Sequence, residues 1–283
     1  MPKRSLVRVV AVVVTLCIIV WAGVFFWQSR GLVAKSNEVS SGGKLINTED
    51  SSGPEIIIDK DQLKNLPQPE TDGKTMEEIE EEQEDNPSIV VPATFNLDIP
   101  FYAQAPDGNW ELPWKEACEE ASIILSHYFL ADRSLSKSQF KEEVLSMTRV
   151  QEEMFGSAID TTVAQTAQLY TKYYGTDFKT KIINNPTIKQ IKYELSQGHP
   201  VVAPFAGKKL WNSNFTNGGP RYHMLVIRGY DEKYFYTNDV GTRLGENFPY
   251  TYAVIMDALH DLVPEWKGDI ATGKKKILVL MKG

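Results

Sequence analysis

The distribution of hydrophobic and polar positions divides the chain into three parts. Residues 9–27, VVAVVVTLCIIVWAGVFFW, are apolar or weakly polar throughout and carry no charge. Residues 28–90 are poor in aromatic side chains and end in the acidic run MEEIEEEQED. From residue 91 onward, aromatic residues, short apolar runs and helix-capping sequences occur together. The pattern therefore predicts an apolar span, a polar linker and a folded part, 91–283, of roughly 190 residues, which is enough for one core.

The apolar span is long enough for one transmembrane helix, since a bilayer core of roughly 30 Å needs about 20 helical residues. Lys3, Arg4 and Arg8 precede it. The bias of basic residues toward the cytoplasmic side then places residues 1–8 in the cytoplasm and the folded part outside it. We therefore expect a single-pass protein of the cell membrane. A cleaved signal peptide is the alternative, although its apolar region is usually shorter than 9–27.

The linker carries most of the acidic charge. Residues 28–90 hold 15 acidic and 6 basic side chains, whereas residues 91–283 hold 22 acidic and 21 basic ones. A segment of this composition cannot bury enough apolar surface to offset its chain entropy, so we expect a disordered stalk. Because the folded part is nearly neutral, its charge gives no reason to expect nucleic acid as a partner.

Four helices are predicted in the first half of the folded part. The first has apolar positions at helical spacing, and the third ends at a glycine that suits a helix C-terminus. The second and fourth open with Ser or Thr three residues ahead of Gln, which is a capping-box sequence. The predicted helices are 116–130, a helix that starts at Ser136, 159–174, and a helix from Thr187 to near Gly198.

Strand patterns are concentrated in the second half. The predicted strands are PVVAPF (200–205), YHMLVIRGY (222–230), KYFYTND (233–239) and KKILVLM (275–281). Helices followed by strands, with a tight connection between two of the strands, indicate an α+β fold with an antiparallel sheet. We expect residues 257–283 to complete this sheet.

Cys118 is the cysteine that invites a chemical interpretation. The other cysteine, Cys17, lies in the apolar span, so no disulfide can form within the folded part. Cys118 falls in the first turn of a predicted helix, where the helix dipole favours the thiolate. Glu119 and Glu120 oppose this effect if they point inward. The alternative is a cysteine retained only for packing.

A thiol nucleophile needs a base, and His223 is the best candidate of four histidines. It begins a predicted strand of mostly apolar residues, where its ring can face a cleft. His127 lies too far along the helix of Cys118 to reach the thiol. His199 precedes a proline at a strand entrance, and His260 lies late in the chain.

Strand register provides a candidate partner for His223. If a three-residue loop, Tyr230 to Glu232, joins the two predicted strands, His223 lies directly opposite Asp239. Opposed residues share one face of a sheet, so Asp239 can accept the second imidazole N–H and fix the tautomer of the ring. A loop of even length instead places Asn238 or Val240 opposite His223. Asp239 is therefore a conditional choice, with Asn238 as the runner-up.

Acyl chemistry also requires hydrogen-bond donors for an oxyanion. The backbone N–H of Cys118 supplies one, and Gln104 in IPFYAQAPD is the candidate for another. The loop AGKKLWNSNFTNGGPRYH, 206–223, leads into the candidate base. Its Trp211 and Phe215 are candidates for substrate contact, although a packed surface loop explains them equally well. We find no spacing of metal ligands and no nucleotide or phosphate motif, so no metal or cofactor is predicted.

Three motifs in this order, IPFYAQ, W-x3-ACEEAS and YHMLVIRGYDEKYFYTNDVGT, resemble the bacteriocin-processing branch of the papain-like cysteine peptidases. The resemblance is to stand-alone relatives in bacterial envelope proteins and spans roughly residues 97–256. It implies a papain-like fold, an oxyanion role for Gln104 and a nucleophilic role for Cys118. It likewise implies that His223 is the general base and that Asp239 orients it.

The resemblance implies hydrolysis of peptide bonds through a thioester acyl-enzyme, with a peptide or protein as substrate. The chain departs from many members by Glu119, where glycine commonly follows the cysteine, and by Val240, where N-D-P is common. Two alternatives remain open on the same residues: a peptidoglycan peptidase or amidase, and an inactive module that binds a peptide in its cleft.

Overall fold

The computed structural model describes residues 91–263 and 268–283. The predicted cytoplasmic end (1–8), apolar span (9–27) and linker (28–90) lie outside the described residues. Among the helices that are described, none has the length and hydrophobicity needed to cross a membrane.

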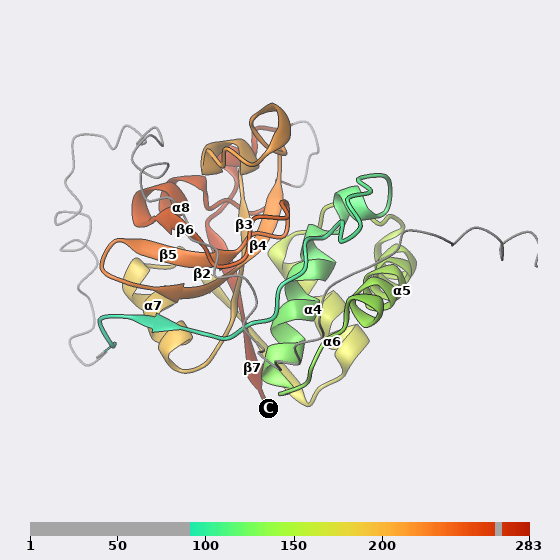
Figure 1. Cartoon of the computed structure of the whole chain (residues 1–283), viewed down its shortest axis with the longest axis horizontal. Helices are drawn as coiled ribbons and strands as arrows, with labels where there is room; N and C mark the ends of the chain where they lie inside the picture. The colour runs from blue at the N-terminus through green and yellow to red at the C-terminus, as the bar shows by residue number, and fades with distance from the viewer. Residues whose placement is uncertain (1–90, 264–267) are drawn as a thin grey trace, which may run out of the picture. The chain divides into compact units, whose positions relative to one another are not determined.

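The described part has an α+β fold built on one antiparallel sheet, with the strand order β2-β7-β3-β4-β5-β6 and β1 paired to β4. The strands are β1 (Phe95–Asn96), β2 (Phe178–Asn184), β3 (Val201–Phe205), β4 (His223–Tyr230), β5 (Tyr234–Asn238), β6 (Phe248–Thr251) and β7 (Lys276–Lys282). The helices are α4 (Cys118–Leu130), α5 (Lys137–Phe155), α6 (Val163–Tyr174), α7 (Ile188–Ser196) and α8 (Tyr252–Ala258). Figure 1 shows α4, α5 and α6 gathered on one side of the sheet and α7 and α8 on the other.

The centre of the sheet is formed by strands that the hydrophobic pattern predicts. All residues of β3 and β4 are buried. The C-terminal strand β7 pairs with β2 on one edge and with β3 on the other, for example Val279 with Val201. The expectation that residues 257–283 complete the sheet is therefore confirmed, and β7 lies within the sheet.

Helix α4 is the central helix of the molecule. Every residue of α4 except Phe129 is buried, including the charged Glu119 and Glu120. Its N-cap is Ala117, whose side chain cannot accept a hydrogen bond from the first turn. Most of the stabilisation of α4 must therefore come from packing on the sheet and on α5 and α6.

The predicted helix 159–174 begins four residues later than expected, at Val163. Thr162 is the N-cap of α6, and its side chain accepts from the backbone N–H of Gln165 in a capping box. The four residues before Val163 are instead non-helical. The capping boxes predicted at Ser136 and Thr187 are confirmed at the starts of α5 and α7.

The register of the β4–β5 hairpin differs from the prediction. The connection begins and ends elsewhere than expected, so that Gly229 pairs with Tyr236 rather than with Lys233. A β-bulge between Ile227 and Gly229 adds a second shift, and Val226 then pairs with Asn238. The expected direct opposition of His223 and Asp239 is therefore wrong. Since the two changes move the register by two positions, the two residues still share one face of the sheet.

Candidate functional site

The side chains of His223 and Asp239 are buried and contact each other at the open end of the β4–β5 hairpin. Nε2 of His223 lies 2.7 Å from Oδ1 of Asp239, and both side chains are almost fully buried. His223 is the first residue of β4, and Asp239 follows directly after β5. This contact leaves Nδ1 of the imidazole for a second partner.

The carboxyl of Asp239 is held by three further donors. Its Oδ2 accepts from the hydroxyl of Tyr250 at 2.6 Å and from Nδ2 of Asn212 at 3.0 Å, and its Oδ1 accepts from the backbone N–H of Gly241 at 3.0 Å. Although burial acts the other way, His223 and these hydrogen bonds lower the pKa of Asp239. Asp239 is therefore an ionised acceptor at neutral pH. No pattern in the sequence marks Asn212 or Tyr250 as partners of Asp239.

Asn238, the runner-up partner of His223, has a different role. Its Oδ1 accepts from Nη1 of Arg228 at 3.1 Å, and its Nδ2 donates to the carbonyls of Ile99 and Pro100 at 3.1 Å each. Asn238 thus ties β5 to the segment that leads toward Gln104. In the structure the residue in contact with His223 is Asp239, and Asn238 makes its contacts elsewhere.

Cys118 is the first residue of α4 and is only 4% exposed. One turn later in the same helix, the hydroxyl of Ser122 donates to the carbonyl of Met224 at 3.3 Å. Met224 directly follows His223 in β4. The N-terminal turn of α4 is therefore docked against the start of β4, which places the thiol beside the strand that carries the candidate base.

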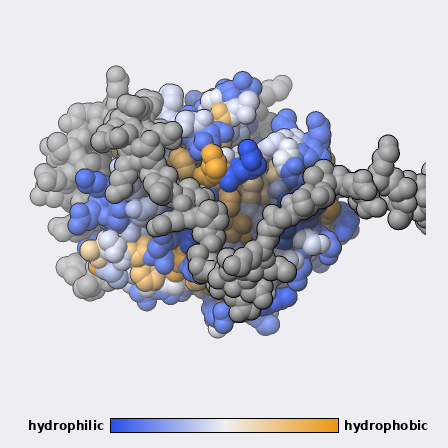
Figure 2. Space-filling model, in the orientation of Figure 1, coloured by the Kyte–Doolittle hydropathy of each residue, from blue (hydrophilic) through white to orange (hydrophobic). Residues whose placement is uncertain are grey.

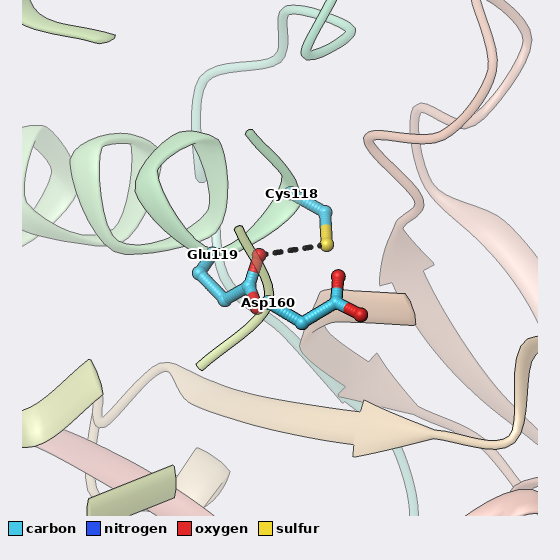
Figure 3. Close-up of side chains that lie close together, drawn as sticks. All are labelled: Cys118, Glu119 and Asp160. Atoms are coloured by element: carbon cyan, nitrogen blue, oxygen red, sulfur yellow. Dashed lines mark hydrogen bonds between the residues drawn. The ribbon is translucent and has the colours of Figure 1, made fainter. Parts of the chain in front are cut away.

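The nearest partner of the thiol is a carboxyl. Sγ of Cys118 donates to Oε2 of Glu119 at 3.0 Å, as Figure 3 shows. The other oxygen of Glu119 accepts from the backbone N–H of Thr161 at 2.7 Å. The carboxyl of Asp160 lies close by, and one ligand atom each of Cys118, Glu119 and Asp160 falls within 4.8 Å of the others. These atom types can bind zinc, but hydrogen bonds already occupy the thiol and both oxygens of Glu119.

The electrostatic environment keeps the thiol protonated. Burial, the carboxyl of Glu119 and that of Asp160 raise the pKa of Cys118, while the backbone N–H of Met224 acts in the opposite direction. Burial and Glu120 raise the pKa of Glu119 to about 7, and burial and Glu119 raise that of Asp160 to about 8. Glu119 thus points inward. In this orientation, as expected from the sequence, its carboxyl opposes the effect of the helix dipole on the pKa of Cys118. In this structure the thiol is a neutral donor.

Gln104 braces the segment that precedes α4. Its Nε2 donates to the carbonyls of Trp114 and Lys115 at 2.9 Å each, and its backbone N–H donates to Val240 at 2.8 Å. Its Oε1 is buried and has no partner among the described residues. Because both amide hydrogens are used, the predicted donation to an oxyanion requires Gln104 to release one of these bonds.

The two aromatic candidates of the loop 206–223 occupy different environments. Phe215 packs edge-on against the ring of His223, with ring centroids 5.5 Å apart. Trp211 is 49% exposed and adopts a positive φ of 53°. Phe215 therefore restrains the imidazole, whereas Trp211 presents a free ring face to solvent. Figure 2 shows hydrophobic residues gathered near the middle of the face it draws, with hydrophilic residues around them.

The other three histidines contact groups other than Asp239. His127 stacks on Tyr174 with ring centroids 3.5 Å apart, and burial lowers its pKa to about 4. Nδ1 of His199 lies 2.9 Å from the carboxyl of Glu194, and Nδ1 of His260 lies 2.8 Å from a backbone carbonyl. His223 is thus the histidine that pairs with the buried aspartate.

Residues 96–266 match the Peptidase C39-like family. A Bacillus anthracis protein described as a C39-like peptidase is similar in structure, with 16% identity and a TM-score of 0.45 over 68% of this chain and 99% of that one. Xylellain, a cysteine protease from Xylella fastidiosa, shows 13% identity and a TM-score of 0.44 over 69% and 87%. No curated protein sequence matches the chain.

Proposed function

Since the chain belongs to the Peptidase C39-like family of papain-like cysteine peptidases, we propose that it hydrolyses peptide bonds outside the cytoplasm while residues 9–27 anchor it in the cell membrane. The observation that carries the catalytic part is the buried contact of 2.7 Å between His223 and Asp239. It lies at the start of the strand against which the helix of Cys118 is docked. The membrane part rests on the apolar span and the basic residues before it.

In the proposed mechanism, Cys118 gives its proton to Nδ1 of His223 and the thiolate attacks the carbonyl carbon of the scissile bond. Asp239, ionised and held by four donors, fixes the imidazole and stabilises its protonated form. The backbone N–H of Cys118, which is free of helix partners in the first turn, donates to the oxyanion. His223 then protonates the leaving amine, and water activated by the same ring hydrolyses the thioester.

Glu119 adds a step to this mechanism. The thiol must leave its hydrogen bond to Glu119 before its proton can pass to His223. Substrate that enters the site and displaces this contact would therefore begin the reaction. The same contact favours the alternative of an inactive peptide-binding module, because a neutral buried thiol is a poor nucleophile.

Peptide hydrolysis by the full chain tests the catalytic part. We expect turnover of a mixed peptide library to fall at least about a thousandfold in Cys118→Ala and in His223→Ala, because each removes a reacting group. Cys17→Ala is the matched control and retains turnover. Full activity in Cys118→Ala would refute the proposal. Binding of peptides without hydrolysis by the unmodified protein would support the binding module instead.

Protease accessibility in intact cells tests the membrane part. We expect the full chain to sediment with membranes and an epitope after residue 283 to be digested from the outer side, whereas an epitope before residue 1 stays protected. Protection of the C-terminal epitope, or a soluble protein, would contradict the proposed anchoring.

A further inference from the structure

A cavity of about 400 Å³ is lined in part by Asp160, whose carboxyl lies near the candidate nucleophile Cys118. Asp160 forms part of its wall, and the polar side chains of Thr161 and Gln165 form another part. The apolar part of the lining is formed by Phe155, Ile159 and Leu262. The cavity therefore combines one carboxyl with hydrophobic walls, and its volume falls within the range of sites for small groups.

The carboxyl of Asp160 faces the thiol across a short gap. One of its oxygens lies within 4.8 Å of Sγ of Cys118, and Figure 3 shows the carboxyl turned toward the sulfur. It is partly exposed, and within the described part of the chain it accepts no hydrogen bond. The neighbouring carboxyl of Glu119, by contrast, is engaged with Cys118. Asp160 thus has free acceptor capacity at the boundary of the cavity and the site.

Hydrogen bonds fix the backbone around Asp160. The N–H of Thr161 donates to Glu119 at 2.7 Å, and the buried hydroxyl of Tyr222 donates to the carbonyl of Thr161 at 2.9 Å. Two residues later, the N–H of Val163 donates to Asp261 at 2.9 Å. The backbone that carries Asp160 is therefore held in a defined position relative to α4 and β4.

Groups of both signs act on the carboxyl. Glu119 and Glu116 raise the pKa of Asp160 as like charges, and Arg221 and His223 lower it as opposite charges. The guanidinium of Arg221 donates to the carbonyl of Gly268. Because burial and Glu119 raise the pKa of Asp160 to about 8, this carboxyl is largely protonated at pH 7 in the empty cavity, and a cation that enters would favour its ionised form.

We infer that this cavity is a specificity pocket for a basic side chain of the substrate, lysine or arginine, placed next to the scissile bond. The methylene stem packs on Phe155, Ile159 and Leu262, and the charged head binds the carboxyl of Asp160. This inference rests on the proposed function. It also gives the substrate a part in catalysis, since a cation at Asp160 offsets the negative charge that disfavours the thiolate of Cys118.

Cleavage of a peptide series tests the pocket. The substrates are alanine octamers with an acetylated N-terminus and an amidated C-terminus. Lysine, glutamine or glutamate replaces alanine at each position in turn, and the full chain is the enzyme. We expect one position near the scissile bond at which lysine raises kcat/KM at least about tenfold over glutamine, because a charge-assisted hydrogen bond is formed there. Asp160→Asn removes this preference. Glu153→Gln, the same charge change on an exposed side chain of α5, retains it.

Binding to an inactive protein separates the pocket from the peptidase activity. The same lysine and glutamine peptides are titrated against Cys118→Ser and against Cys118→Ser with Asp160→Asn. A lysine preference that needs Asp160 supports the pocket even if no peptide is cleaved, in which case only the proposed function fails. Cleavage or binding that does not distinguish lysine from glutamine, or a preference that survives Asp160→Asn, would overturn the inference and leave the peptidase function intact.

Discussion

Glu119 holds the Cys118 thiol in its protonated form through a direct hydrogen bond and through its charge. Glu119→Gln should lower the pKa of Cys118, because the amide removes the charge and can donate to the thiolate while its oxygen still accepts from Thr161. We expect the rate of alkylation by iodoacetamide at pH 7 to rise roughly tenfold, since a drop of about one pKa unit gives about tenfold more thiolate. The pH profile of alkylation measures this shift.

The neighbouring residue provides the control. Glu120→Gln makes the same charge change on the same helix, but Glu120 raises the pKa of Glu119 rather than contacting the thiol. Glu119 should then be more ionised, and alkylation should be unchanged or slower. If both variants accelerate alkylation equally, general charge rather than the Cys118–Glu119 contact controls the thiol.

At this scale the sequence identifies residue types better than their partners. Cys118, His223 and Asp239 stand out by order and motif, but the inward orientation of Glu119 depends on the depth at which α4 is buried. The polar support of Asp239 comes from Asn212 and Tyr250, which lie on separate segments. No local pattern marks such residues, because only the folded chain brings them together.

The loop after β5 controls the position of the imidazole. A Cβ on Gly241 would lie 2.9 Å from Cε1 of His223 and 3.0 Å from Cε1 of Phe215, which is closer than real side chains approach. Gly241→Ala should therefore push the ring away from Asp239. We expect kcat/KM to fall roughly tenfold to hundredfold, because small displacements of a catalytic group are costly. The free energy of unfolding should fall by only about 1–3 kcal/mol, as in other overpacked sites.

Two variants distinguish displacement of the ring from general damage to the loop. Leu244→Ala shortens an exposed side chain of the same loop and should leave peptide hydrolysis unchanged. Phe215→Leu added to Gly241→Ala removes the second ring that the added Cβ would meet and should recover part of the activity. Equal losses in Leu244→Ala and Gly241→Ala would show that the loop as a whole, and not the imidazole, is sensitive.

Helices and strands with a strong hydrophobic pattern or a capping sequence can be predicted from the sequence, and the others cannot. The capping boxes of α5 and α7 and the apolar runs of β3 and β4 are found from the sequence. Strand β2, FKTKIIN, has no fully buried residue, and β6 is short and contains Pro249, so neither has a clear strand pattern. The β4–β5 register was missed because a bulge leaves no reliable mark in the sequence.

The buried carboxyls make the stability of the molecule depend on pH. The pKa of Glu119 and that of Glu120 are raised to about 7, mainly by burial, and that of Asp160 is raised to about 8. Above pH 6.5 these groups are already ionised in the unfolded chain, whereas the folded protein still binds their protons. The folded state therefore loses stability as pH rises through 7 and 8. We expect the free energy of unfolding to fall by on the order of 2 kcal/mol between pH 6.5 and 8.5.

Urea denaturation of the full chain at these two pH values measures the effect. His127, whose pKa is lowered to about 4, is half protonated in the unfolded chain at pH 6.5, so it opposes this fall by only about 0.4 kcal/mol, near the lower end of the window. Glu119→Gln should reduce the pH dependence by removing one of the three groups. A stability that is constant or rises over this range would contradict the burial of these carboxyls in their protonated form.

The missing side-chain cap of α4 has a consequence for the newly made chain. Helices α5, α6 and α7 each begin with a capping box and can start to form locally, whereas α4 depends on strands synthesised after it. Ser122 and Met224, which dock α4 on β4, are 102 positions apart. A nascent chain therefore has the thiol but no paired imidazole beside it. Under the proposed mechanism, folding itself would act as the activation step, and a half-made chain would be unable to cleave its neighbours.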